Sequence, residues 1–297
     1  MRSNVDEAPR PHGEGVSVQE NPFLEVRDIV KNFGGVRALD GVNMAVWPGE
    51  VLCLAGENGC GKSTLIKVIS GVHAPDAGRI LIDGHTVSSL TPLSAMDAGI
   101  QVIYQDFSLF SNLTVAENIM MTSSVTEKKK FFSSTSAKQQ AAQIVERLGV
   151  PLPLDADVEQ LSVADKQLTA ICRALAGNAK LLIMDEPTSY LDVFHQNAVL
   201  SLIKKLNNER KTCVIFISHH PDHALAAADK TLLLNGPLGY EFGATDQILK
   251  GENYKIDFSR FSNGGKYMSF NVSVFVKDDL HRNEIFERLK AHFKYVL

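Results

Sequence analysis

The chain has 297 residues, of which 44% are hydrophobic, so it can bury a sizeable core in one large domain or two modest ones. Its formal net charge is -4, which gives no general basic surface and argues against a nucleic-acid partner. Four scattered cysteines form no C-x-x-C pair and no apolar run reaches the roughly 18 residues of a membrane span, so we expect a reduced cytosolic protein that meets a membrane only at its surface.

The N-terminal part predicts a lead-in followed by strands. Residues 1–21 are polar and contain prolines and glycines, and we expect them to be disordered. From Pro22 on, FLEVRDIVKNF, VRALDGVNMAVW and EVLCLA look like strands. Phe33 lies in the first of them, upstream of a glycine-rich loop. An aromatic ring there can stack on adenine or be an ordinary core side chain, and its position alone does not separate the two.

The stretch GENGCGKST matches G-x-x-x-x-G-K-[ST], the phosphate-binding loop of nucleotide hydrolases. It lies between an apolar strand and a helix, which is the context the motif requires; a chance match in a glycine-rich turn is the alternative. The glycines let backbone amides turn inward around a β-phosphate, and the helix dipole favours the same anion. Lys62 would place its charge on the β/γ oxygens, and Ser63 would offer its hydroxyl to Mg²⁺. The predicted nucleotide-binding residues are Gly56, Glu57, Asn58, Gly59, Cys60, Gly61, Lys62, Ser63 and Thr64.

The middle of the chain predicts strands and then a helical region. GRILIDGHTV predicts two strands joined by a turn, and IQVIYQDFSLF predicts a buried strand that ends near Gln105. The region of about 107–175 reads as mostly helical. Its last helix, over LSVADKQLTAICRALAG, has Ser162 as its N-cap.

Two further apolar strands end in residues that suggest chemistry. Leu181 to Met184 is followed by Asp185 and Glu186. In a chain with a phosphate loop, Asp185 would hold Mg²⁺ and Glu186 would orient or deprotonate the attacking water; a solvated strand end is the alternative. TCVIFIS is followed by a pair of histidines, beginning with His219. Two histidines can suggest a metal, yet no carboxylate or cysteine is spaced to complete such a site.

Alternating helices and apolar strands predict an α/β fold, with a mainly parallel sheet and helices on both faces. Nucleotides bind at the carboxyl ends of such strands, where all of these motifs fall. Residues 257–297 differ, because YMSFNVSVFV alternates like a strand and NEIFERLKAHF has helical spacing. We expect a C-terminal β-α extension of unknown role.

Taken together, these motifs resemble those of the ATP-binding-cassette (ABC) ATPases, most closely those that power sugar importers. The resemblance covers roughly residues 23–249. It is carried by FGGVRAL, GENGCGKST, SGVHAPDAGRILIDG, AGIQVIYQDFSLFSNLTVAENI, LSVADKQ, LLIMDEPTS and FISHH. It implies an ABC-type P-loop domain over residues 22–256 that hydrolyses ATP with Mg²⁺. Within it the family has an antiparallel β subdomain and a helical subdomain, here about 107–175.

The resemblance also implies roles for single residues. Phe33 looks like the adenine-stacking aromatic, Gln105 like the glutamine that reaches metal or water, and His219 like the histidine that contacts the γ-phosphate. Asp192 resembles the loop that crosses to a partner cassette, and Ser162 would contact the partner's nucleotide. The implied catalytic residues are Glu186, His219 and Gln105, and the implied metal ligands are Ser63, Gln105 and Asp185.

The family assembly implies partners and a location. They are a membrane permease, a second ABC ATPase copy of the same or a related chain and, indirectly, a periplasmic or surface solute-binding protein, at the cytoplasmic face of the cell membrane. A soluble cassette that acts in translation or DNA repair is the alternative. It would normally bring a second cassette, a long coiled coil or a basic surface, and none is visible in the sequence. A catalytically weak regulatory cassette is a third reading, but Lys62, Asp185, Glu186 and His219 are all present.

Two positions depart from the family pattern, and one segment suggests a docking surface. The signature is LSVAD rather than LSGGQ or LSVAQ, and we expect the Asp165 carboxylate to face away from the phosphates that it would repel. Tyr190 replaces a small residue. The region from Gln105 to Ile119 presents apolar side chains in a polar stretch, which predicts contact with the permease; packing within the helical region is the alternative. These side chains are Phe107, Leu109 and Phe110.

Overall fold

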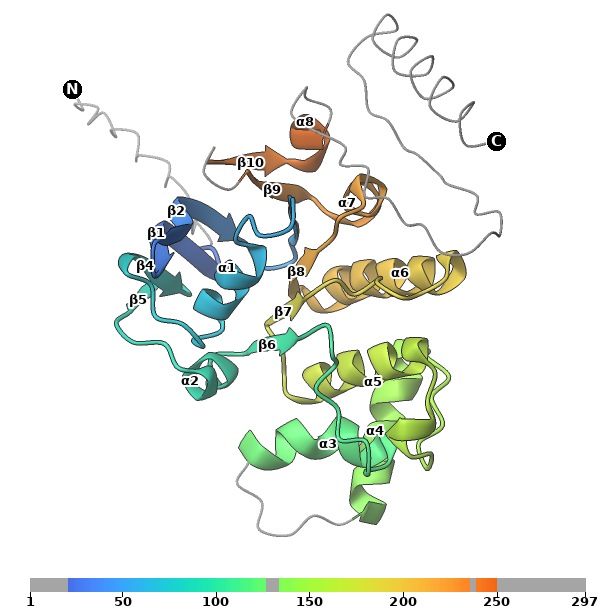
Figure 1. Cartoon of the computed structure of the whole chain (residues 1–297). Coiled ribbons are helices and arrows are strands. Elements are labelled where there is room, and N and C mark those ends of the chain that lie inside the picture. Colours follow the sequence, from blue (N-terminus) through green and yellow to red (C-terminus); the bar gives the residue numbers. More distant parts are fainter. Residues whose placement is uncertain (1–20, 127–133, 236–238, 250–297) are drawn as a thin grey trace, which may run out of the picture.

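The computed structural model of the chain describes residues 21–126, 134–235 and 239–249. Apart from Asn21, the expected lead-in over residues 1–21 lies outside these ranges, and so does the expected extension over residues 257–297. The described part consists of two sheets, the helices that flank them and a separate group of helices (Figure 1).

The larger sheet has six strands in the order β10-β9-β3-β8-β7-β6. All of its neighbouring pairs are parallel except β9 with β10, which lies at one edge. The central strands are continuous apolar runs, as a parallel sheet covered on both faces requires. The strands are β3 (Val51–Gly56), β6 (Ile100–Ile103), β7 (Leu181–Met184), β8 (Cys213–Ile217), β9 (Lys230–Leu234) and β10 (Tyr240–Ala244).

Both faces of this sheet are buried, in two separate hydrophobic clusters. Along β3, Val51, Cys53 and Ala55 point into one cluster, whereas Leu52 and Leu54 point into the other. The first cluster includes the helical region and α6, and the second includes α1 and part of the smaller sheet. One face is thus covered by helices and the other by a helix together with strands. The helices beside the sheets are α1 (Lys62–Ile69), α2 (Pro92–Asp97), α6 (Val193–Arg210), α7 (Pro221–Ala227) and α8 (Thr245–Leu249).

The smaller sheet is antiparallel, with the order β2-β1-β4-β5. The predicted turn of GRILIDGHTV is confirmed, because Ile82 pairs with His85 across Asp83 and Gly84. Both turn residues have positive φ angles, of 49° and 77°, as a tight hairpin of this kind requires. The strands are β1 (Leu24–Phe33), β2 (Val36–Val46), β4 (Ala77–Ile82) and β5 (His85–Val87).

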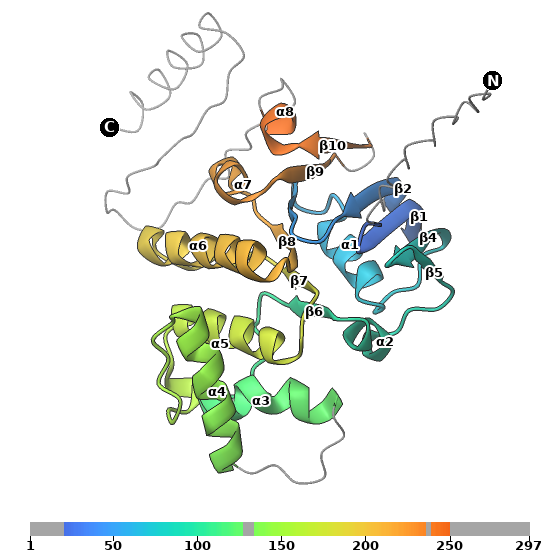
Figure 2. The same ribbon diagram turned by 180° about the vertical axis from the view of Figure 1, so that it is seen from behind.

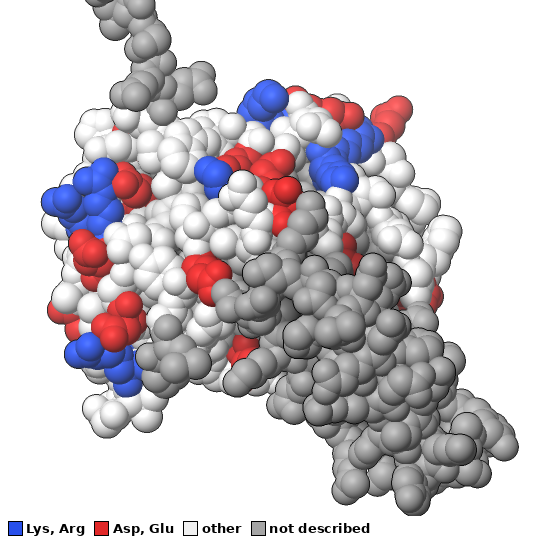
Figure 3. Space-filling view, turned by 90° about the horizontal axis from the view of Figure 1, so that it is seen from above, with Lys and Arg blue, Asp and Glu red and all other residues white. Residues whose placement is uncertain are grey.

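The group of helices lies apart from α1 and the smaller sheet, as the two opposite views show (Figures 1 and 2). It consists of α3 (Val115–Thr126), α4 (Ser134–Leu148), the 3-10 turn η1 (Val158–Gln160) and α5 (Val163–Ala176). Among the described residues, no helix is both long and apolar enough to cross a bilayer. Basic and acidic side chains are mixed on the face shown in Figure 3, with no continuous basic surface among the coloured residues.

Candidate active site

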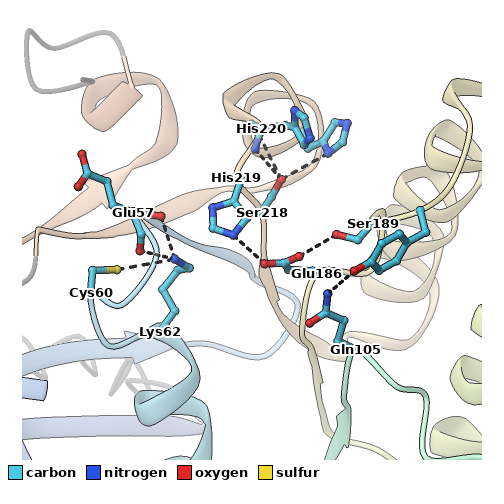
Figure 4. Close-up of polar contacts among 12 residues, drawn as sticks. Glu57, Cys60, Lys62, Gln105, Glu186, Ser189, Ser218, His219 and His220 are labelled. Carbon is cyan, nitrogen blue, oxygen red and sulfur yellow. Dashed lines mark hydrogen bonds and ion pairs between the residues drawn. The ribbon is translucent and has the colours of Figure 1, made fainter. Parts of the chain in front are cut away.

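Four neighbouring strands of the larger sheet end at one edge, and each is followed by a predicted site residue (Figure 4). β3 runs into the glycine-rich loop, and β6 ends two residues before Gln105. β7 is followed by Asp185 and Glu186, and β8 ends two residues before His219. Because these strands are parallel, their carboxyl ends meet, and the sheet brings together residues that are far apart in the sequence.

The glycine-rich loop requires glycine at the positions that the motif specifies. Gly56, Gly59 and Gly61 have φ angles of 132°, 81° and 108°, which L side chains rarely adopt. A Cβ on Gly56 would lie 2.3 Å from the carbonyl oxygen of Leu234, and one on Gly61 would lie 2.4 Å from that of Ala38. The loop is therefore held between β9 on one side and β2 on the other.

Lys62 is the first residue of α1 and is 6% exposed. Its ammonium turns back into the loop and donates to the carbonyl oxygens of Gly56 at 2.8 Å and Glu57 at 2.7 Å (Figure 4). Ser63 is exposed beside it, and Thr64 is half-buried. A cation and the amino end of a helix thus face the same small loop, which is the combination that binds phosphate.

The carboxylates after β7, Asp185 and Glu186, are both half-buried but have different surroundings. Burial raises the pKa of Asp185, the neighbouring Glu186 raises it further, and Lys62 opposes both effects. Glu186 has a φ of 51° and accepts hydrogen bonds on both oxygens. Its Oε1 lies 2.6 Å from Nε2 of His219, and its Oε2 accepts from the Ser189 hydroxyl at 2.8 Å (Figure 4). The predicted residues Glu186 and His219 are therefore in direct contact.

Gln105 is exposed, and its Nε2 donates to the Tyr190 hydroxyl at 3.3 Å (Figure 4). Tyr190 is 79% exposed and has a φ of 64°. Tyr190, which departs from the family pattern, therefore forms a hydrogen bond with Gln105, the predicted loop glutamine. No group of three or more metal-binding side chains (His, Cys, Asp or Glu) occurs among the described residues, and none is formed around the two histidines after β8.

Comparison with known proteins identifies the family. The sequence matches the ABC transporter family over residues 39–189. The chain belongs to the ABC transporter family. The ribose import ATP-binding protein RbsA 2 of Streptomyces avermitilis is 42% identical to it over 218 residues, which are 73% of this chain and 43% of that protein. The cassette therefore spans less than half the length of this curated relative.

Solved structures support the fold. A nucleotide-free ATP-binding cassette from an ABC transporter matches with a TM-score of 0.68 and 27% identity, over 77% of this chain and 94% of that one. A dimeric cassette in a post-hydrolysis state, bound to ADP and Pi, matches with a TM-score of 0.62 and 25% identity, over 72% and 94%. The predicted class, an α/β P-loop cassette with an antiparallel β part and a helical part, is confirmed.

Phe33 lies at the end of β1 and is 44% exposed, so it is not an ordinary core residue of this cassette. Its ring meets the ring of His73 edge to face, with the centroids 5.2 Å apart, and Lys31 Nζ lies 5.6 Å from its centroid. The hairpin that carries Phe33 continues into β2, whose Ala38 touches the glycine-rich loop. Stacking on adenine remains a prediction.

Ser162 is the N-cap of α5, as predicted. Its hydroxyl oxygen accepts from the backbone N–H of Asp165 at 3.1 Å and donates to Oδ2 of Asp165 at 2.8 Å. The Asp165 carboxylate, which we expected to face away from the phosphates, therefore contacts the Ser162 hydroxyl of the signature. The backbone contact caps the helix, and the carboxylate at its third position takes up the proton of the same hydroxyl.

The segment after β6 is more buried than its sequence suggested. Phe107 and Leu109 are partly buried against the core, and only Phe110 is largely exposed, at 48%. Arg173 on α5 donates to the carbonyl oxygens of Phe107 at 2.9 Å and Ser108 at 2.7 Å. The predicted apolar surface is therefore narrower than expected and centres on Phe110.

Sequence reasoning missed the side chains that support the loops carrying Glu186 and His219. Ser189 binds the Glu186 carboxylate, and the buried His223 lies between Thr188 and Ser218. The only signal for His223 is its position four residues after His219, at the start of a short helix. That spacing says nothing about a partner on another strand.

Proposed function

We propose that the cassette binds and hydrolyses ATP with Mg²⁺, as the energy-supplying subunit of an importer. The observation that carries this proposal is the assembly of Lys62, Asp185, Glu186 and His219 at one sheet edge. The loop geometry fits a nucleotide, because the positive φ angles of Gly56, Gly59 and Gly61 allow the backbone amides to turn inward around a phosphate. A hydroxyl on Ser63 and a half-buried carboxylate on Asp185 are hard oxygen ligands of the kind that Mg²⁺ prefers, with the Gln105 amide oxygen as a third.

Each residue then has a separate task. The Lys62 ammonium exchanges its two loop carbonyls for the β/γ-phosphate oxygens, and the loop amides from Gly56 to Thr64 surround the phosphates. Mg²⁺, when bound, neutralises charge that develops on the phosphate oxygens. Glu186 orients the attacking water and accepts its proton as the bond to the γ-phosphorus forms and the bond to ADP breaks. A carboxylate has about four lone-pair sites, so the contacts from Ser189 and His219 leave room for a water.

Assembly as a dimer follows from the position of Ser162. It lies at the amino end of α5, in the group of helices that Figures 1 and 2 show away from α1. A phosphate on the Lys62 loop therefore needs a second cassette to supply the signature end. The dimeric cassette with ADP and Pi that matches this chain supports a two-fold arrangement.

Coupling to import rests on the relatives. The protein from Streptomyces avermitilis is called a ribose import ATP-binding protein, and 42% identity supports a sugar or a similar small polar solute as cargo. We therefore place the chain on a separate membrane permease, at the cytoplasmic face of the membrane, with a solute-binding protein as indirect partner. The cassette domain would span residues 22–256, with a helical subdomain of about 107–175, and residues 257–297 would form a separate extension.

Glu186→Gln tests this proposal. The variant keeps the loop that binds phosphate but loses the base, so ATP affinity should stay near that of the wild type while turnover falls by roughly 100-fold or more. ATP should then hold it as a stable dimer, seen as an ATP-dependent shift in sedimentation. Glu209→Gln, the same change at an exposed site in the last turn of α6, is the matched control and should behave as the wild type.

The outcomes separate the parts of the proposal. Wild-type turnover in Glu186→Gln would remove Glu186 from the mechanism. A monomer at high concentration with saturating ATP would refute self-pairing and leave a related cassette as the partner. Co-purification with a membrane permease from native membranes would distinguish an importer subunit from a soluble cassette ATPase.

A further inference from the structure

The loops that carry Glu186 and His219 are joined twice, once at the site and once behind it. At the site, the two side chains meet at 2.6 Å. Behind it, the ring of His223 on α7 reaches both loops through one atom. Its Nδ1 lies 3.2 Å from Oγ1 of Thr188 and 3.4 Å from Oγ of Ser218. Thr188 follows Glu186 by two residues, and Ser218 directly precedes His219.

This second junction is buried. His223 is 6% exposed, Thr188 5% and Ser218 4%. A buried polar group without a partner is costly, so these three groups stabilise each other's positions more than a surface contact would. Ser218 is also fixed locally, because its oxygen accepts from the backbone N–H of His220 at 3.0 Å. The loop that leads into His219 is therefore shaped by the same hydroxyl that His223 contacts.

We propose that His223 is a positioning residue for ATP hydrolysis, which holds the Glu186 loop and the His219 loop at the separation that catalysis needs. The inference rests on the proposed roles of Glu186 and His219. His223 does not touch the glycine-rich loop in any contact described above, so it acts on turnover and leaves nucleotide binding unchanged. A small displacement of two groups that must act on one water is enough to lower a rate by a large factor.

Burial lowers the pKa of His223, which favours the neutral form of the ring. Asp222 raises this pKa and His220 lowers it further, and the rings of His220 and His223 lie 4.8 Å apart. In the neutral ring, Nδ1 can accept from a hydroxyl, whereas a protonated ring can only donate. The junction thus places one ring nitrogen between two hydroxyl groups.

Two substitutions at this position separate shape from hydrogen bonding. His223→Phe keeps a ring but removes Nδ1. His223→Asn has a smaller side chain but keeps a polar atom on Cγ, where Nδ1 is attached. His85→Phe makes the same chemical change at an exposed residue of β5, in the smaller sheet, and is the matched control.

We expect His223→Phe to lower kcat by roughly tenfold or more, with the KM for ATP and the Kd of a non-hydrolysable ATP analogue each within about twofold of the wild type. His223→Asn should recover most of the lost kcat, and His85→Phe should leave kcat unchanged. Thr188→Val should lower kcat in the wild type but have little further effect in His223→Phe, because both changes break one junction.

Three results would overturn the inference: kcat of His223→Phe within about twofold of the wild type, additive effects of His223→Phe and Thr188→Val, or equal losses of kcat and analogue affinity that Asn does not recover. The last pattern would mean that His223 only supports the fold. A wild-type chain that does not hydrolyse ATP at all would refute the proposed function instead, so the two failures are distinguishable.

Discussion

The contact between the glycine-rich loop and β2 predicts that two chemically identical substitutions in one loop will differ in cost. Gly59→Ala and Gly61→Ala each place a methyl group on a residue with positive φ, at 81° and 108°. At Gly59 nothing lies within 4 Å of the new Cβ, whereas at Gly61 the carbonyl oxygen of Ala38 lies 2.4 Å away and Leu39 Cδ2 lies 3.0 Å away. The first change strains only the backbone, and the second also pushes two elements apart.

The expected costs follow from these two effects. An L residue in a left-handed conformation loses about 1–2 kcal/mol, and this applies to both variants. Overpacking against a fixed neighbour adds about 1–3 kcal/mol, and a backbone carbonyl in a sheet is such a neighbour. Gly59→Ala should therefore lower the free energy of unfolding by about 1–2 kcal/mol and Gly61→Ala by about 2–5 kcal/mol.

Urea unfolding of the nucleotide-free chain, followed by circular dichroism, measures both values in one experiment. The wild type and the two variants should share one slope against urea, so that the midpoints report stability alone. Equal midpoints for the two variants would mean that the loop does not pack on β2 as described. A Gly61→Ala midpoint within error of the wild type would refute the reasoning altogether.

Three further outcomes are expected. Phe33→Ala should weaken ATP binding by about 1 kcal/mol, a roughly fivefold rise in Kd by calorimetry, whereas Phe33→Trp should retain affinity; equal Kd values would exclude stacking. Asp185→Asn should raise the thermal midpoint of the nucleotide-free chain at neutral pH while it abolishes Mg²⁺-dependent turnover. The raised pKa of Asp185 means that its ionised form costs stability above that pKa, and this cost is relieved as the pH falls; an unchanged midpoint would contradict it. Phe110→Glu should impair assembly with the permease but leave the stability and ATPase of the isolated chain intact, whereas Phe107→Glu should lower stability, because Phe107 packs on the core.

The parts of the fold that the sequence predicts are those governed by local rules. β7 and β8 are short runs of buried apolar residues, and their ends place Asp185, Glu186 and His219 at one edge before any distance is known. The N-cap at Ser162 is predictable from its own hydroxyl and the helix that follows. The hairpin formed by β9 and β10 was missed, because Tyr240–Ala244 is a run of only five residues, all of them half-buried.

What the sequence does not predict is which side chains meet across loops. The contact of Gln105 with Tyr190 joins residues 85 positions apart, and that of His223 with Thr188 joins residues 35 apart. Both depend on how two strand ends lie relative to each other, which no local pattern encodes. Phe107 shows the same limit in reverse. It looks exposed in a polar stretch, but it is half-buried against the hydrophobic cluster that includes the helical region.

The departure at Asp165 leads to a last prediction. We expect its carboxylate to oppose the closure of two cassettes around ATP. The Ser162 hydroxyl has one proton, and it is donated to Asp165. To donate to a γ-phosphate of a partner cassette, Ser162 must release this carboxylate, which then lies near an anion of its own sign. Two unit charges 4 Å apart repel by about 1 kcal/mol in water, and by more where a closing dimer excludes water.

Asp165→Asn keeps an acceptor for the hydroxyl and removes the charge. In the Glu186→Gln background it should lower the dissociation constant of the ATP-bound dimer by roughly fivefold for each of its two nucleotide sites. Glu159→Gln, at an exposed residue of the turn before α5, is the control and should have no effect. Dimerisation that is unchanged or weaker in Asp165→Asn would show that the carboxylate stays clear of the phosphates in the closed dimer.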